Sequence, residues 1–164
     1  MNIVNQANWG HRGEIWVIFQ FILIPLHFAI PLVLGQGPWA WFDPFMGAGR
    51  WIAIAITVPG LLLALGGAGF LGRNLTALPQ PKADSKLVTT GPYAFVRHPI
   101  YGGLVLLGWA WAVLWEAPVP LTGALVLTLF FRLKAHQEEK RLVLRYPDYV
   151  LYRKRTRALI PWVF

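Results

Sequence analysis

The sequence has no cysteine among its 164 residues, which excludes disulfides, a thiolate nucleophile and any metal site built on cysteine. Charged residues are also scarce, at 13%, or half of the roughly 25% that soluble domains carry. Hydrophobic residues make up 56% of the chain, which is too many for a disordered protein. The length predicts a single domain, residues 1–164, and its polar surface is too small for water to be its only surroundings.

The charges that remain are unbalanced, because fifteen Lys and Arg residues against seven Asp and Glu residues give a formal net charge of +8. The basic residues avoid the long apolar stretches, which argues against nucleic acid as a partner. Fourteen of the fifteen lie in three segments, 1–14, 72–99 and 132–164, and the other is Arg50. The excess therefore indicates the orientation of the chain in a membrane.

Two uncharged stretches are long enough to cross a bilayer: 15–34, with twenty residues, and 51–71, with twenty-one. About 20 apolar residues span a hydrocarbon core of roughly 30 Å. A third apolar region contains one charged residue, Glu116, followed by two prolines, and predicts short helices at 100–115 and 117–133. These two helices form either a thin double crossing or a helical hairpin packed inside the bundle.

The predicted fold class is all-α integral membrane, with four transmembrane helices, the last two a short hairpin, and a cytoplasmic C-terminal amphipathic helix. Four spans place both termini and the long middle segment on one side. The excess of Lys and Arg makes that side cytoplasmic, and we expect a bacterial inner membrane. Segments 78–101 and 134–164 then lie together at the cytoplasmic helix ends.

Polar and small residues inside the spans give two more expectations. The second span has small residues at four-residue spacing, a row that serves packing within the chain or dimerisation: Gly60, Ala64, Ala68 and Gly72. The oligomeric state stays open. In the first span, His27 follows Gln20 by seven residues on roughly the same face, and we expect these two side chains to pair by a hydrogen bond.

The first polar segment gathers Arg97, His98 and Tyr101 where a membrane helix begins. Gly91-Pro92 is a turn signal, and Pro99 suits the first position of a helix. Free N–H groups at a helix start favour an anion, and an arginine there can clamp a carboxylate or phosphate. Alternatively, Arg97 and His98 anchor the chain at the interface and the following glycines serve packing.

The second polar segment carries Glu138 and Glu139 on either side of an apolar helical stripe made of Phe131, Ala135, Leu142 and Tyr146. One interpretation is ion pairing along the helix with Lys134 and Arg141. The other is that a glutamate turns into the bundle and holds a cationic or hydroxyl-bearing ligand, since carboxylates at a membrane edge are costly.

Beyond this helix, Arg153-Lys154-Arg155 predicts a contact with anionic lipids, and the apolar end 159–164 either packs back on the bundle or lies at the interface. We expect no metal site, because His98, His136 and Glu138 come from distant segments without a recognised ligand spacing.

In order, these segments read Leu87-Val88-Thr89-Thr90-Gly91-Pro92-Tyr93, Arg97-His98-Pro99-Ile100-Tyr101-x-Gly103, Glu138-Glu139-x-x-Leu142 and Tyr149-x-x-Tyr152. Over roughly residues 72–164 the chain resembles the isoprenylcysteine carboxyl methyltransferase family and its bacterial and phospholipid methyltransferase relatives. The resemblance implies a small integral-membrane methyltransferase that uses S-adenosyl-L-methionine. The chain has no Gly-x-Gly-x-x-Gly fingerprint of a Rossmann domain, which agrees with this.

The resemblance places the cofactor site at Gln80, Lys86, Leu87, Val88, Tyr93, His98, Pro99, Ile100, Tyr101 and Glu138, with Gln80 matching only across a gap. Arg97, Lys134 and Glu139 are the residues predicted to serve the reaction. Aromatic faces attract a sulfonium, and a carboxylate suits ribose hydroxyls or an ammonium. Methyl transfer from the sulfonium is an in-line displacement, so positioning and desolvation carry most of the acceleration.

The predicted acceptor is a lipophilic small molecule or lipid that enters from the bilayer, and membrane lipids are the other expected partners. Eukaryotic prenylcysteine enzymes have an arginine four residues before the first glutamate, where this chain has Lys134. A lysine lacks the planar fork that grips a carboxylate twice, which weakens a prenylcysteine carboxylate as the acceptor. Two other hypotheses stay open: an NADPH-dependent membrane reductase, since sterol reductases share the Arg-His-Pro-x-Tyr run, and a non-catalytic membrane scaffold.

Overall fold

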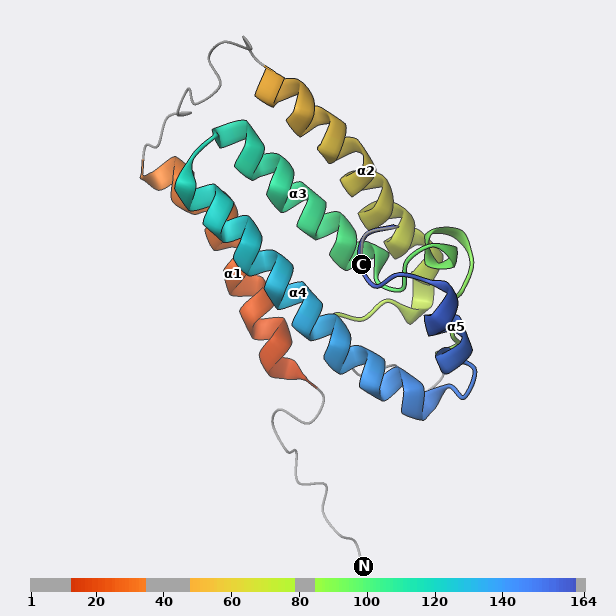
Figure 1. Cartoon of the computed structure of the whole chain (residues 1–164). Helices are drawn as coiled ribbons and strands as arrows, with labels where there is room; N and C mark the ends of the chain where they lie inside the picture. Colours follow the sequence, from red (N-terminus) through yellow and green to blue (C-terminus); the bar gives the residue numbers. More distant parts are fainter. Residues whose placement is uncertain (1–12, 35–47, 79–84, 162–164) are drawn as a thin grey trace, which may run out of the picture.

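The computed structural model describes residues 13–34, 48–78 and 85–161. Within them the chain forms helices without a strand: α1 (Glu14–Val33), α2 (Ala48–Leu71), η2 (Gly72–Asn74), η3 (Gly91–Ala94), α3 (Pro99–Trp115), α4 (Pro118–Arg145) and α5 (Tyr149–Arg155). Figure 1 shows α1 to α4 as one bundle of antiparallel neighbours, with α3 between α2 and α4, and α5 beyond one end. The all-helical fold class is confirmed.

Among the described residues, three helical stretches are long and apolar enough to cross a membrane: α1, the stretch Gly49–Asn74, which includes all of α2 but its first residue, and α4. Their outer faces expose large apolar side chains, such as Phe21 at 66% and Leu65 at 69%, a surface suited to lipid. The protein is therefore an integral membrane protein. With 17 residues, α3 is about 25 Å long, so a fourth crossing stays a prediction.

The hairpin of α3 and α4 starts and turns where its prolines indicate. Each helix begins with a proline, Pro99 or Pro118, a position where the missing N–H costs nothing. Between the helices, Glu116 takes a left-handed conformation, with φ 48° and ψ 36°. The chain therefore reverses its direction over two residues, Glu116 and Ala117.

The small residues Gly60 and Ala64 of α2 pack against α3, so this row serves packing within the chain, one of the two uses expected for it. A Cβ on Gly103 of α3 would lie 2.5 Å from the Gly60 oxygen and 2.6 Å from the Ala64 nitrogen. The backbones of the two helices therefore touch there. Gly72 has no such neighbour, and Gly67 instead packs against Pro99, 2.8 Å from where its Cβ would be.

The predicted boundary at residue 133 is not a helix end. Instead, α4 continues without a break from Pro118 to Arg145, over 28 residues. At 1.5 Å per residue this is about 42 Å, longer than the hydrocarbon core. The predicted amphipathic helix is thus the last part of α4, and α5 is a separate, shorter helix.

After α5 the chain folds back on the start of α3. Val96 and Arg157 form a parallel bridge, and the His98 amide donates to the Ala158 oxygen at 3.0 Å. Leu159 is fully buried in the core with Val105 and Phe131, so the start of the apolar end packs on the bundle. Residues 162–164 lie outside the described residues.

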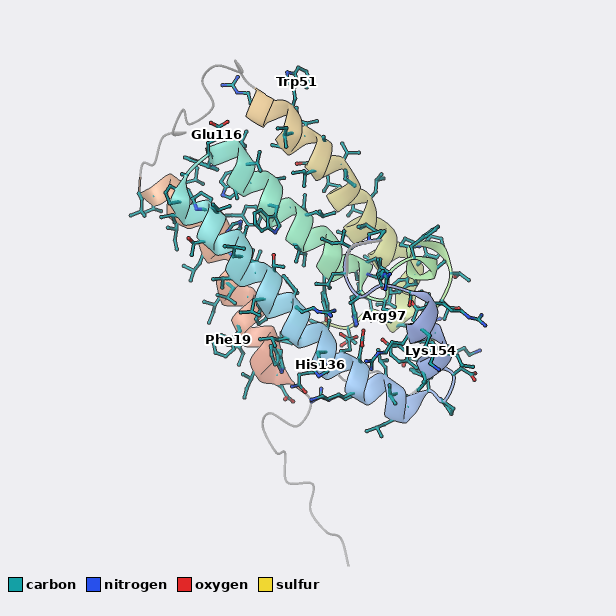
Figure 2. All side chains as sticks on the ribbon, in the orientation of Figure 1. Phe19, Trp51, Arg97, Glu116, His136 and Lys154 are labelled. Carbon is teal, nitrogen blue, oxygen red and sulfur yellow. The ribbon has the colours of Figure 1, made fainter. Side chains whose placement is uncertain are left out.

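The start of α1, the end of α2, the start of α3 and the end of α4 lie at one end of the bundle (Figure 1). Figure 2 shows Arg97, His136 and Lys154 at this end, and Trp51 and Glu116 at the other. The grouping of the polar segments follows the sequence prediction, while the side of the membrane they occupy stays a prediction.

Candidate active site

A cavity of about 410 Å³ lies at the polar end of the bundle. Its volume falls within the range of small-molecule sites, roughly 300–1,000 Å³. Residues of α1, the end of α2, the segment 85–101, α4 and α5 line it: Gln20, Leu71, Asn74, Leu75, Thr76, Ala77, Leu78, Ser85, Lys86, Leu87, Val88, Tyr93, Arg97, His98, Ile100, Tyr101, Lys134, Glu138, Leu142, Tyr146, Tyr149 and Tyr152. Residues up to 132 positions apart in sequence, Gln20 and Tyr152, therefore share one site.

Ten of the predicted site residues line this cavity: Lys86, Leu87, Val88, Tyr93, Arg97, His98, Ile100, Tyr101, Lys134 and Glu138. Among the described residues, Pro99 and Glu139 are not part of the lining. Pro99 packs against Gly67, and Glu139 is buried beside the cavity wall. The predicted Gln80 lies outside the described residues.

Glu138 presents its carboxylate to the cavity. The Tyr101 hydroxyl donates to Glu138 Oε2 at 2.9 Å, and His98 Nδ1 lies 3.8 Å from the same oxygen. The imidazole of His98 is stacked on the Tyr101 ring, with 5.4 Å between centroids and 4° between planes. The Glu138 side chain keeps 23% of its surface exposed, so its oxygens have room to accept hydrogen bonds from a ligand hydroxyl or ammonium.

Glu139 pairs with Arg97, and its Oε1 also lies 3.5 Å from His98 Nε2. Arg97 Nε donates to Glu139 Oε1 at 2.6 Å, and its Nη1 donates to the carbonyl oxygens of Arg153 and Thr156. Arg153 Nε adds a contact of 3.6 Å to Glu139 Oε2. The guanidinium thus joins the start of α3, the C-terminal part of α4 and the end of α5.

Lys134 is completely buried, although it follows the lipid-facing part of α4. Its Nζ donates to the Gln20 side-chain oxygen of α1 and to the Ala77 carbonyl oxygen, the latter at 3.3 Å. It also lies 5.1 Å from the centre of the Tyr101 ring, within reach of a cation–π interaction. The ion pairs of Glu138 and Glu139 described above reach other segments rather than running along α4.

The expected pair of Gln20 and His27 is wrong. Gln20 contacts Lys134 instead, and His27 Nε2 lies 3.1 Å from the Gly108 oxygen of α3. Helical spacing places both residues on one face of α1, but each finds its polar partner elsewhere. Gln20 meets Lys134 of α4, and His27 lies between the Gly108 oxygen of α3 and Gly123 of α4.

Every tyrosine of the chain lines the cavity: Tyr93, Tyr101, Tyr146, Tyr149 and Tyr152. Burial raises the pKa of Tyr152 to about 12, and it raises the pKa of Tyr93 and Tyr149 further above the ordinary value. These phenols therefore stay protonated near neutral pH and act as hydrogen-bond donors. Their ring faces give the cavity an electron-rich wall.

Several lining residues were missed from the sequence, and two kinds of signal were present. Gln20 is a polar residue within an otherwise apolar span, which is expensive unless it has a partner. Tyr146, Tyr149 and Tyr152 recur every three residues before the basic cluster 153–155, but this spacing alone does not show where their side chains point. In the described part of the chain no group of three or more His, Asp or Glu residues is placed to hold a metal ion.

Three relatives place the chain among known proteins. It is 28% identical over 156 residues to the nickel-cobalt-cadmium resistance protein NccN of Alcaligenes xylosoxydans, covering 92% of this chain and 65% of the relative. It is 30% identical over 161 residues to the cobalt-zinc-cadmium resistance protein CzcN of Cupriavidus metallidurans, covering 92% and 64%. The chain thus spans slightly less than two thirds of the length of these two relatives.

The third relative carries an enzymatic name. Over 75 residues the chain is 39% identical to methanethiol S-methyltransferase 1 of Bradyrhizobium diazoefficiens, covering 43% of this chain and 24% of the relative. The family model for phospholipid methyltransferases matches residues 48–148, which is more than half of the chain and includes the whole of α2, α3 and α4. The chain therefore belongs to the phospholipid methyltransferase family.

Proposed function

We propose that the chain is an S-adenosylmethionine-dependent methyltransferase that acts on a lipophilic acceptor at the polar end of the bundle. The observation that carries this proposal is the cavity, because it brings both polar segments of the sequence together around ten of the predicted site residues. Membership of a methyltransferase family supports the same reaction class.

The donor set of the cavity suits the proposed cofactor. S-adenosylmethionine supplies an electrophilic methyl group when bound, and it carries hydroxyls, an ammonium and a sulfonium. Glu138 offers carboxylate oxygens for the hydroxyls or the ammonium, and the tyrosine rings offer faces for a sulfonium. The Tyr149 hydroxyl is buried without a hydrogen-bond partner among the described residues, whereas His98 Nε2 lies 3.5 Å from Glu139 Oε1. The phenol is therefore the polar atom that a ligand could satisfy.

The remaining polar residues have different proposed roles. Arg97 and Glu139 are positioning residues, since they bind each other and Arg97 also binds the end of α5. This arrangement holds His98, the next residue, against Tyr101. Lys134 faces the acceptor, because its ammonium lies in the cavity wall beside Gln20 of the lipid-exposed helix α1.

A buried ammonium favours an acceptor with a negative end, such as a carboxylate or a thiolate, over a cationic amine. The thiol named for the Bradyrhizobium relative adds small thiols to the candidates. We also propose that the polar end lies in the cytoplasm of a bacterial cell, as the distribution of Lys and Arg predicts. Apolar side chains exposed on α1 and α2 then give the acceptor a route from the lipid.

A transfer assay tests this proposal. Purified protein in detergent is incubated with S-adenosylmethionine carrying a radiolabelled methyl group and with prenylcysteines, phospholipids, thiols and small carboxylates in turn. We expect label in an anionic acceptor and none in samples with Glu138→Ala. Affinity for NADPH above that for the methyl donor would support the reductase hypothesis, and tight cofactor binding with no transfer would support the scaffold.

A further inference from the structure

The five tyrosine hydroxyls around the cavity do not all have the same use. Four of them bind the protein itself: Tyr93 donates to the Gly67 oxygen at 3.3 Å, Tyr101 to Glu138 at 2.9 Å, Tyr146 to the Ser85 oxygen at 2.8 Å, and Tyr152 to the Tyr93 oxygen at 2.6 Å. These four hydroxyls form hydrogen bonds between the segments that line the cavity.

Tyr149 is the exception within the described residues. Its side chain is buried, with 1% of its surface exposed, yet its hydroxyl has no hydrogen-bond partner among the described residues. Most buried polar atoms in folded proteins are paired, and an unpaired one costs stability. The side chain also belongs to the cavity lining, so the unpaired hydroxyl lies in a residue of the cavity wall.

Packing and the backbone hold the Tyr149 ring, and the hydroxyl is not needed for this. The ring meets the Tyr152 ring edge-on, with centroids 5.6 Å apart and planes at 68°. The Tyr149 amide donates to the Tyr146 oxygen at 3.0 Å, which fixes the first turn of α5. Phenylalanine at this position would make the same ring contacts. The ligand-free protein should therefore be more stable with phenylalanine than with a tyrosine whose buried hydroxyl is unpaired.

We propose that the Tyr149 hydroxyl is a ligand-binding group, which donates a hydrogen bond to an oxygen or nitrogen atom of the molecule that occupies the cavity. The identity of that molecule as S-adenosylmethionine rests on the proposed function. Burial, followed by the charge of Glu139, raises the pKa of Tyr149 above its ordinary value, so the phenol acts as a donor at neutral pH.

Two variants separate this role from a structural one. Tyr149→Phe and the matched Tyr152→Phe each remove one hydroxyl from neighbouring rings of the same wall. Isothermal titration with S-adenosylhomocysteine and the thermal midpoint of the ligand-free protein are measured in detergent for both. We expect Tyr149→Phe to bind about fivefold to tenfold more weakly than wild type, the size of one hydrogen bond. Its midpoint should equal or exceed that of wild type, whereas Tyr152→Phe should lower the midpoint.

The outcomes distinguish the two proposals. If wild type binds and Tyr149→Phe binds equally well, the inference fails and the proposed function stands. A midpoint of Tyr149→Phe lowered as much as that of Tyr152→Phe, without weaker binding, would assign the hydroxyl a structural role and overturn the inference. If wild type does not bind S-adenosylhomocysteine, the proposed function fails and the inference fails with it.

A second ligand locates the partner atom. The same titration is repeated with 5′-methylthioadenosine, which lacks the aminocarboxylate. If Tyr149 binds the adenosine part of the ligand, Tyr149→Phe should still bind this compound more weakly than wild type. The loss disappears if Tyr149 binds the amino-acid part. Either result supports a hydrogen bond from Tyr149 to the ligand.

Discussion

Arg97 Nε lies 2.6 Å from Glu139 Oε1, and both side chains are more than nine-tenths buried. The two residues are 42 positions apart, and their ion pair joins the start of α3 to the C-terminal part of α4. Further bonds from Arg97 reach the carbonyl oxygens of Arg153 in α5 and of Thr156, the residue that follows it. This pair therefore holds three segments around His98, the residue next to Arg97.

Glu139→Gln should lower the stability of the fold strongly. Removing one partner of a buried ion pair leaves an uncompensated charge and costs about 3–5 kcal/mol. The thermal midpoint in detergent measures the effect, with Arg155→Ala, on an exposed residue of α5, as the control that should change little. A double variant with Arg97→Met and Glu139→Leu should recover part of the loss. Equal midpoints for Glu139→Gln and Arg155→Ala would contradict a structural ion pair.

Gly103→Ala should separate α2 from α3. The added Cβ would lie 2.5 Å from the Gly60 oxygen and 2.6 Å from the Ala64 nitrogen, so the backbones must move apart at a cost of at least about 1–3 kcal/mol. Gly69→Ala is the matched control on α2, because its Cβ meets nothing within 4 Å and alanine favours a helix. The idea fails if both variants have the same thermal midpoint.

Gln20→Leu should destabilise the chain by removing an acceptor from buried Lys134. A buried donor without its partner costs about 1–3 kcal/mol, and Gln20→Glu should avoid this loss because a carboxylate oxygen still accepts. Phe21→Leu changes an adjacent, lipid-exposed residue and serves as the control. Thermal midpoints in detergent give the comparison, and a Gln20→Leu midpoint at the level of Phe21→Leu would argue against the contact.

The stability of the protein should fall in alkaline solution through its buried tyrosines. Burial raises the pKa of Tyr152 to about 12, while the phenol of an unfolded chain has a pKa of about 10. The stabilisation from the protonated phenol is thus complete below about pH 10 and is lost as the pH rises toward 12. The thermal midpoint of wild type should decline over this interval, and Tyr152→Phe should decline less steeply. Parallel slopes would contradict the assignment.

The sequence predicted the helices because apolar length and proline position are local properties. Pro99 and Pro118 mark the starts of α3 and α4, as expected for a first helical turn. The end of α4 was misplaced, since the change from apolar to charged residues at position 134 marks the limit of the lipid and not the limit of the helix.

The sequence predicted only those site residues that belong to its motifs. Residues of the segment 86–101 and Glu138 meet in one cavity as expected. The part played by Gln20 depends on how α1 packs against α4, and helical spacing gives the face of a residue without naming its partner. For the same reason the sequence did not show that the free hydroxyl belongs to Tyr149 rather than to Tyr146 or Tyr152.

Isothermal titration of the purified protein in detergent with S-adenosylhomocysteine tests most directly whether the cavity beside Glu138 binds the proposed cofactor. Glu138→Ala removes the carboxylate that faces the cavity, and Asp148→Ala removes an exposed carboxylate that makes no capping bond to α5. We predict that wild type and Asp148→Ala bind alike and that Glu138→Ala binds at least about tenfold more weakly, as expected for a lost hydrogen bond to a charged group. Absence of binding by wild type, or equal binding by Glu138→Ala, would contradict the account.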